Sequence, residues 1–224
     1  SRLLPKEDPD ASAAVQAAFE HDGITLALGS EAIRVEKDGD GGRLIVRQHG
    51  QERAIEFDRL LLALGRTANV SGFGLEELGV RVSAKGTVEA DPLMRTTMPN
   101  IYVCGDVTGP FQFTHVAAHQ AWYAAVNALF GPFWTFKVDY RVIPWATFTD
   151  PEVARVGLSE TEATAQGIPF EVTRYGLDDL DRAIADSHDE GFVKVLTVPG
   201  KDTILGATIV GAHAGDLLAE FVLA

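Results

Sequence analysis

Residues 96–109 read TTMPNIYVCGDVTG, and this stretch decides how the rest of the chain is interpreted. Its apolar centre, residues 101–104, predicts a buried strand, and Gly105 and Asp106 follow at the carboxyl end of that strand. In doubly wound sheets, ligands bind outside the carboxyl ends of the strands. A carboxylate there can accept hydrogen bonds from the hydroxyls of a sugar or ribityl chain. An aspartate after a strand is also a common turn residue.

A helix is predicted over residues 114–130, starting eight residues after Asp106. Alanines gather on one of its faces, and Gly131-Pro132 ends it. The amides and dipole at a helix N-terminus favour negative charge, such as that at the N1/O2 edge of a reduced isoalloxazine ring. A hydroxyl acceptor and a helix N-terminus this close together predict a flavin site.

Upstream, the chain shows the element order of the distal half of a dinucleotide-binding fold. Asp8 at the N-cap, Pro9 after it and Gly23 at the end predict a first helix. A short buried strand is predicted at residues 24–28, and alternating polarity predicts antiparallel strands at 32–37, 43–49 and 51–57. Residues 60–64 are apolar throughout, which is typical of a parallel strand covered on both faces.

Downstream, an α+β domain with an antiparallel sheet is predicted. Ser159 and Glu162 form a capping-box pattern, and strands are expected at 170–175, 192–198 and 204–210 before a last helix near Gly215. The interpretation is therefore an α/β protein with three regions: residues 1–65, 66–140 and 141–224.

The composition excludes several classes of partner. The net charge of −13 disfavours nucleic acid and anionic membranes, and the longest apolar run is far shorter than the roughly 20 residues of a membrane span. A cytoplasmic location is expected. The single cysteine, Cys104, allows no intramolecular disulfide and no cysteine-rich metal site, and we expect it to be a small apolar residue of the buried strand. No metal ligands are assigned.

Four ordered motifs resemble the pyridine nucleotide–disulfide oxidoreductase family. Residues 96–109 resemble its second flavin-binding signature, and LLLALGRTAN at 60–69 resembles its strand-to-return segment. FTDPEVARVGL at 148–158 resembles the opening of its dimerisation domain, and GFVK at 191–194 also matches. The similarity covers essentially the whole chain, and FTHVAAHQAW at 113–122 is most similar to mercuric-reductase-like members.

The resemblance implies the cofactors FAD and NAD(P)H and a set of binding residues. Asp106, with Gly105 beside it, matches the contact to the ribityl–phosphate part of the flavin. The segment beside the isoalloxazine ring comprises Gln112, Phe113, Thr114 and His115. The nicotinamide-nucleotide site is matched by Gly65 with Ala63, Leu64 and Arg66 adjacent, and Ala32 falls at its adenine end. No catalytic residue is assigned, because the resemblance gives His115 a backbone role.

The implied activity is electron transfer from NAD(P)H through flavin to a disulfide, mercuric ion or related small-molecule acceptor, in a homodimer. The first glycine-rich FAD motif, the C-x4-C pair and the closing histidine of the family are expected outside residues 1–224. The chain alone is therefore expected to be inactive. Two alternatives stay open: a non-catalytic dimerisation fragment, and an NAD(P)H:quinone-type flavoprotein without a redox disulfide.

Overall fold

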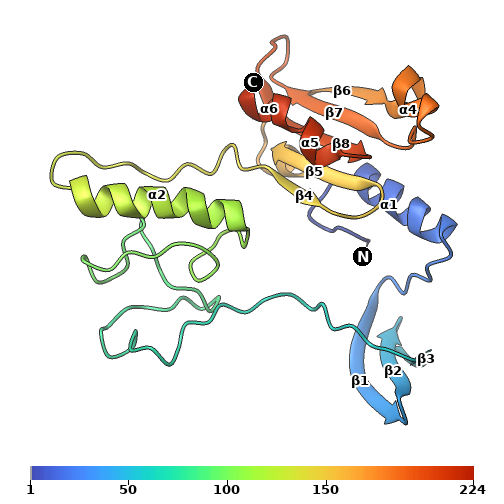
Figure 1. Cartoon of the computed structure of the whole chain (residues 1–224), viewed down its shortest axis with the longest axis horizontal. Coiled ribbons are helices and arrows are strands. Elements are labelled where there is room, and N and C mark those ends of the chain that lie inside the picture. Colours follow the sequence, from blue (N-terminus) through green and yellow to red (C-terminus); the bar gives the residue numbers. More distant parts are fainter. Residues whose placement is uncertain (1) are drawn as a thin grey trace. The chain divides into compact units, whose positions relative to one another are not determined.

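The computed structural model describes residues 2–224 and divides into two compact units, Ser1–Leu61 with Arg141–Ala224, and Leu62–Tyr140. Figure 1 follows the chain through its elements. The helices are α1 (Pro9–His21), α2 (Thr114–Phe130), α3 (Glu160–Ala165), α4 (Asp181–Ala185), α5 (Ala214–Leu217) and α6 (Ala219–Leu223), with a 3-10 turn at Leu177–Asp179. The strands are β1 (Ser30–Asp38), β2 (Gly41–Gln48), β3 (Gln51–Phe57), β4 (Trp145–Thr147), β5 (Glu152–Gly157), β6 (Glu171–Gly176), β7 (Phe192–Thr197) and β8 (Ile204–Gly211). Within residues 2–224, none of the helices is long and apolar enough to span a bilayer.

The larger unit contains a five-stranded antiparallel sheet in the order β4-β5-β8-β7-β6. This confirms the predicted antiparallel α+β architecture. Strands β6, β7 and β8 lie at the predicted ranges, within one residue at each end, whereas β4 and β5 were not predicted. The capping box is confirmed, because the Ser159 hydroxyl accepts from the Glu162 amide and the Glu162 carboxylate accepts from the Ser159 amide.

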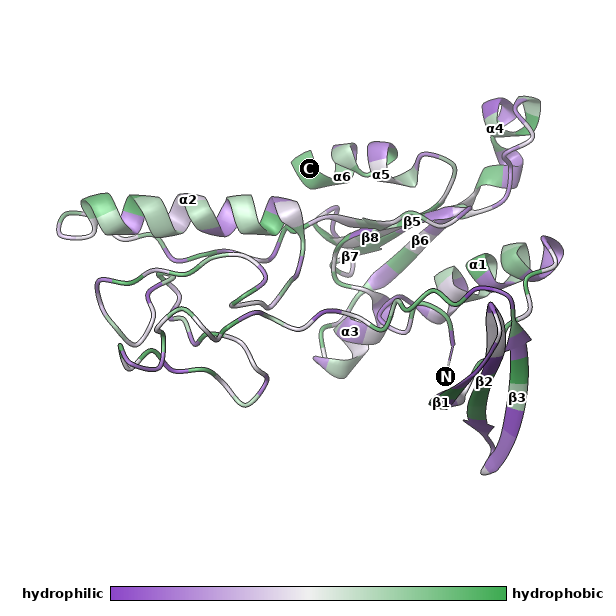
Figure 2. Ribbon diagram, turned by 60° about the horizontal axis from the view of Figure 1, so that its bottom comes forward, coloured by the Kyte–Doolittle hydropathy of each residue, from purple (hydrophilic) through white to green (hydrophobic). Residues whose placement is uncertain are grey.

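This sheet is covered by helices on both faces (Figure 2). Helices α5 and α6 pack on one face, where Ala154, Val156, Ala207 and Ile209 are buried with Ala214 and Leu218. On the opposite face α1 contributes Ala11 and Val15, which pack on Val153, Phe192 and Val210. Each fully buried Val, Leu, Ile or Phe side chain of these clusters stabilises the fold by about 1.5–3 kcal/mol, and each alanine by less. The helix predicted for a dinucleotide-binding half therefore packs on the sheet of the C-terminal region.

Two buried cations lie on the α1 face of the sheet. Arg155 and Lys194 are both directly opposite Thr208 in register, so the two cations flank one residue of the central strand. Each is 1% exposed. A buried charge is tolerated only when it is paired, so both need anionic partners from outside the sheet.

The anionic partners come from residues 7–10, which span the start of α1, and from α3. Lys194 Nζ lies 2.9 Å from Asp8, 2.8 Å from Asp10 and 2.8 Å from Glu160. Arg155 pairs with Glu7 at 2.9 Å through Nε and with Glu162 at 3.0 Å through Nη2. Burial lowers the pKa of Lys194, but these hydrogen bonds outweigh it and raise the pKa above its usual value.

Asp8 occupies the N-cap position of α1, as predicted, but its side chain does not cap that helix. Its carboxylate accepts hydrogen bonds from the backbone amides of Glu160 and Thr161, each at 3.0 Å, and so caps α3 instead. Burial raises the pKa of Asp8, but the Thr161 amide and the Lys194 ammonium outweigh this and lower the pKa from 3.8 to about 2. Segment 7–10 is thus tied to the sheet by charge, and α1 is held there by the apolar packing of Ala11 and Val15.

The three-stranded antiparallel sheet β1-β2-β3 matches the predicted meander. The predicted strand at residues 24–28 is wrong. Those residues are not in a strand, and Ile24 is half exposed. The backbone of Leu28 finds its partner in a side chain, since Gln48 Nε2 donates to its carbonyl at 2.9 Å. A short, mostly apolar segment forms a strand only where a neighbouring strand supplies hydrogen bonds.

The unit Leu62–Tyr140 has little regular structure besides α2, which has the predicted bounds. The predicted strands at 60–64 and 101–104 are both wrong. Leu61 and Leu64 are almost fully exposed, and among residues 2–224 no strand pairs with them. Tyr102 forms only an isolated bridge with Arg95. Apolar composition predicts a strand, but pairing partners decide whether one forms.

Candidate flavin-binding turn

Residues 105–109 form a tight turn at the place where the sequence predicts the flavin contact. Gly105 has φ +83°, a conformation that glycine adopts without strain. Its carbonyl accepts from the amide of Thr108 at 3.1 Å, and the Thr108 hydroxyl donates to the Val88 carbonyl at 3.0 Å. A Cβ added at Gly105 would lie 3.3 Å from the Cβ of Ala117, so the turn sits against the first turn of α2.

Asp106 stands on this turn with its side chain 42% exposed. Its carboxylate pairs with Arg66 at 3.3 Å, and the arginine side chain is 70% exposed. The structure therefore brings together one residue predicted for the flavin and one predicted for the nicotinamide nucleotide. An ion pair this exposed contributes about 0–1 kcal/mol, so either partner can exchange it for a ligand at little cost.

The residues predicted beside the isoalloxazine ring lead into α2. The rings of Phe113 and His115 stack with centroids 5.4 Å apart and planes 7° apart, and Phe111 stacks on Phe113 at 6.1 Å. Gln112 is partly buried and Thr114 is exposed. Phe113 is the N-cap residue of α2, and a phenyl ring cannot accept hydrogen bonds from the amides of the first turn. The amides at this helix N-terminus would stabilise an electron-rich group bound there.

The residues predicted for the nicotinamide nucleotide lie in two places. Ala63, Leu64, Gly65 and Arg66 form an exposed stretch without regular structure, in which Gly65 has φ +106°. Ala32 is exposed on β1 of the other unit, where the register with β2 shifts between Ala32 and Arg34.

Cys104, which precedes the turn, is exposed. The prediction that it is buried in a strand is wrong, because residues 101–104 do not enter a sheet.

Gln120 is a residue of this region that the sequence interpretation did not single out. It lies on α2 and is fully buried. Its side chain hydrogen bonds to the backbone of Gly105 and Gly109, at the two ends of the turn. The sequence carries a signal for it. Gln120 is a polar residue on the same helical face as Val116 and Ala124, four residues away on either side, and both of these are buried.

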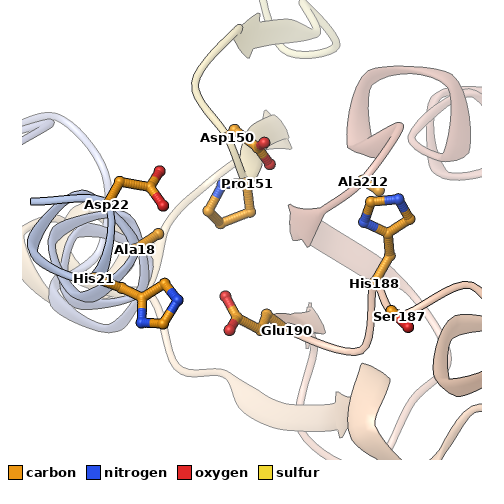
Figure 3. Close-up of a pocket in the computed structure, with 9 residues that line it drawn as sticks. All are labelled: Ala18, His21, Asp22, Asp150, Pro151, Ser187, His188, Glu190 and Ala212. Atoms are coloured by element: carbon orange, nitrogen blue, oxygen red, sulfur yellow. The ribbon is translucent and has the colours of Figure 1, made fainter.

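A separate pocket of about 210 Å³ lies between the end of α1, the turn at Asp150-Pro151 and the loop before β7. Figure 3 shows the side chains of His21 and Glu190 directed into it. All of its polar lining residues are exposed, which is the arrangement of a solvated groove. In the part of the chain that the structure describes, no group of three or more His, Cys, Asp or Glu side chains could hold a metal ion.

Comparison with known families identifies the chain. The family model described as pyridine nucleotide-disulphide oxidoreductase matches residues 1–121, and the model of the dimerisation domain of the same family matches residues 143–224. The chain therefore belongs to the pyridine nucleotide-disulphide oxidoreductase family, which confirms the predicted resemblance.

The curated relatives are oxidoreductases. Dihydrolipoyl dehydrogenase of Chlamydia muridarum is 37% identical over 223 residues, which cover 100% of this chain and 46% of the relative. Mercuric reductase of Bacillus cereus is also 37% identical over 223 residues, covering 100% of this chain and 35% of the relative. The chain thus spans about half or less of the length of these relatives.

Solved structures agree in fold. LpdA from Mycobacterium tuberculosis superposes with a TM-score of 0.87 at 27% identity, covering 98% of this chain and 47% of that one. The flavoprotein disulfide reductase RclA from Escherichia coli has a TM-score of 0.84 at 24% identity, covering 100% and 50%. The predicted fold class is thereby confirmed.

Proposed function

We propose that this chain supplies the flavin-contacting turn and the dimerisation domain of an FAD-dependent oxidoreductase. In the whole protein, electrons would pass from NAD(P)H through FAD to a disulfide, mercuric ion or related acceptor. Family membership supports this assignment, and one observation carries it. The carboxylate of Asp106 stands on a turn that is fixed against the first turn of α2.

The residues present fit FAD by their chemistry. Asp106 offers a partly exposed acceptor for ribityl hydroxyls. Phe113 is the N-cap residue of α2, and its side chain cannot cap the first-turn amides. These amides would favour the electron-rich edge of the isoalloxazine ring. When bound, FAD supplies the hydride-accepting ring, and the protein contributes its position and the charge around it.

Arg66 has a defined part in this proposal. It holds the Asp106 carboxylate at 3.3 Å from an exposed position, so it orients the acceptor and can be displaced when a hydroxyl binds. The neighbouring Gly65, at φ +106°, leaves its backbone open to close approach. We assign Ala63, Leu64, Gly65 and Arg66 to the nicotinamide nucleotide and Ala32 to its adenine end.

The partner is proposed to be a second copy of the same protein. Residues 143–224 match a dimerisation domain, and α5 and α6 cover one face of its sheet. Leu217 is half exposed on α5 and Leu223 is 85% exposed on α6, which leaves apolar surface available for association. Sedimentation of the full-length protein as a monomer at high concentration would contradict this part of the proposal.

The test is FAD retention in the full-length protein with Asp106→Ala. Hydrogen bonds to a charged group are worth about 1.5–3 kcal/mol, so the Kd for FAD should rise about 10- to 100-fold.

The matched control is Glu89→Ala. Glu89 forms an equally exposed ion pair in the same unit, with Arg81 at 3.1 Å, and it lies outside the turn. Equal FAD retention in wild type and Asp106→Ala would remove Asp106 from the site.

A further inference from the structure

The side chain of Gln120 is fully buried and makes three hydrogen bonds. Its Oε1 accepts from the amide of Gly105 at 2.6 Å. Its Nε2 donates to the carbonyl of Gly109 at 2.7 Å and to the hydroxyl of Tyr140 at 2.9 Å. A buried side-chain amide with unpaired donors or acceptors would destabilise the fold. The fold therefore requires these hydrogen-bond partners around Gln120.

The two backbone contacts lie at opposite ends of the turn that carries Asp106. Inside the turn, the amide of Gly109 is 3.4 Å from the Gly105 carbonyl, a long hydrogen bond that defines the loop weakly by itself. The inward-facing Gly105 amide and Gly109 carbonyl both depend on Gln120. Gln120 therefore links the two ends of the turn directly, in addition to the hydrogen bond from the Thr108 amide to the Gly105 carbonyl.

We propose that Gln120 is the positioning residue of the flavin-binding turn. It does not touch the flavin. It acts through the backbone of Gly105 and Gly109, which place the Asp106 carboxylate relative to the N-terminus of α2. This inference rests on the proposed function, because it takes FAD as the ligand of the turn.

The packing of α2 fixes the position of Gln120 and therefore its contacts to Gly105 and Gly109. Val116 and Ala124, one turn before and after Gln120, are 0% and 8% exposed, so the helix cannot rotate around Gln120 without uncovering them. The position of the Asp106 carboxylate relative to the N-terminus of α2 is thus fixed. A ligand that contacts both requires this.

Only an amide satisfies both ends of the turn at neutral pH. An ionised glutamate could accept from Gly105 but could not donate to the Gly109 carbonyl, and methionine could do neither. A protonated glutamate regains one donor. Because burial raises the pKa of a carboxyl group, that protonation falls within an accessible pH range.

Tyr140 forms the third hydrogen bond of the Gln120 side chain. Its hydroxyl accepts from Gln120 Nε2 and donates to the sulfur of Met94 at 3.8 Å. Burial raises the pKa of Tyr140, although the hydrogen bond from Gln120 opposes this rise, so the hydroxyl stays protonated at neutral pH. Of the three hydrogen bonds of Gln120, Tyr140→Phe removes only the one to Tyr140. It should therefore change FAD affinity less than a substitution of Gln120.

The chain offers a matched control on the same helix. Asn127 is 2% exposed and, like Gln120, makes three side-chain hydrogen bonds. Its Nδ2 donates to the carbonyls of Leu93 and Phe136, and its Oδ1 accepts from the amide of Phe136. None of these groups belongs to the turn, so Asn127→Leu removes a buried amide of equal connectivity without touching residues 105–109.

The experiment compares Gln120→Met, Gln120→Glu and Asn127→Leu in the full-length protein. Gln120→Met and Asn127→Leu should both lower the thermal midpoint. Only Gln120→Met should raise the Kd for FAD, by roughly tenfold or more, and shift the visible flavin spectrum. Gln120→Glu should bind FAD more tightly at pH 6 than at pH 8, a dependence absent from wild type.

Hydrogen exchange of the flavin-free protein separates this inference from the proposed function. The Gly105 amide should exchange faster in Gln120→Met and at the wild-type rate in Asn127→Leu. Unchanged exchange, or equal loss of FAD affinity in both variants, would overturn the inference about Gln120. A wild-type protein that binds no FAD would overturn the proposed function, while the exchange result would still decide whether Gln120 holds the turn.

Discussion

The two units of this chain bury polar groups in different ways. In the unit built on the five-stranded sheet, β-ladders satisfy much of the backbone, and the buried charged side chains Arg155 and Lys194 are paired with carboxylates. In Leu62–Tyr140, regular backbone pairing is confined to α2 and two isolated bridges. There the buried amides of Gln120 and Asn127 hold irregular backbone in place.

The difference follows from the need to pair every buried backbone donor and acceptor. A sheet meets this need by itself, so its buried side chains are available for long-range attachment, here of segment 7–10 to β5 and β7. An irregular segment has to use side chains for the same purpose. Removing a buried charge in the first unit should therefore lower the stability of the whole unit. Removing a buried side-chain amide in the second unit should mainly loosen the one turn that it contacts.

The largest effect is expected from Lys194→Met. The change leaves Asp8, Asp10 and Glu160 without their shared cation, and breaking a buried ion pair by removing one partner costs about 3–5 kcal/mol. Denaturant unfolding followed by circular dichroism should show this loss.

The control for that change is Arg182→Met. Arg182 pairs with Asp186 one helical turn away and its side chain is 81% exposed, so its loss should cost less than about 1 kcal/mol. If Lys194→Met were no more destabilising than Arg182→Met, the ion network would not be what attaches segment 7–10.

A smaller, pH-dependent effect is expected at Asp8. Because its pKa in the folded protein is about 2 instead of 3.8, its charged form adds stability on the order of 2 kcal/mol above pH 4. This contribution is lost as the pH falls from about 4 towards 2. Asp8→Asn should therefore be less stable than wild type at pH 6 and approach it near pH 2.5. A difference in unfolding free energy that stays constant with pH would refute the pairing.

The smallest effect is expected at the capping box of α3. Ser159→Ala removes the acceptor for the Glu162 amide and should cost about 1 kcal/mol. Hydrogen exchange should show the change at α3 and none in Leu62–Tyr140. Faster exchange within Leu62–Tyr140 as well would contradict the expectation that this substitution acts on the first unit alone.

Local signals predicted much of this fold. The bounds of α2 follow from its alanine face and Gly131-Pro132, and β7 and β8 are separated at the predicted turn Pro199-Gly200. Strand β5 was missed because Arg155 occupies one of its buried positions. An arginine reads as exposed in a sequence, and it is buried here because Glu7, nearly 150 residues earlier, neutralises it.

The errors share a physical cause. Residues 24–28, 60–64 and 101–104 are mostly apolar segments, and whether they form strands depends on pairing partners that are distant in sequence. The sequence of each segment does not contain those partners. Gly105 and Asp106 form a turn with φ +83° at Gly105, although the strand predicted before them is absent. Its support from Gln120 was missed, since a polar residue on an alanine-rich helix looks exposed until its backbone partners are placed.

The most direct test of the central claim is the visible spectrum of the full-length protein during anaerobic titration with NADH. The account predicts an oxidised flavin spectrum that is lost on NADH addition and that weakens with Asp106→Ala but not with Glu89→Ala. A long-wavelength thiolate-to-flavin band would identify a disulfide or mercuric ion as the acceptor to test. A full-length protein without any flavin spectrum, even after incubation with FAD, would contradict the proposed function.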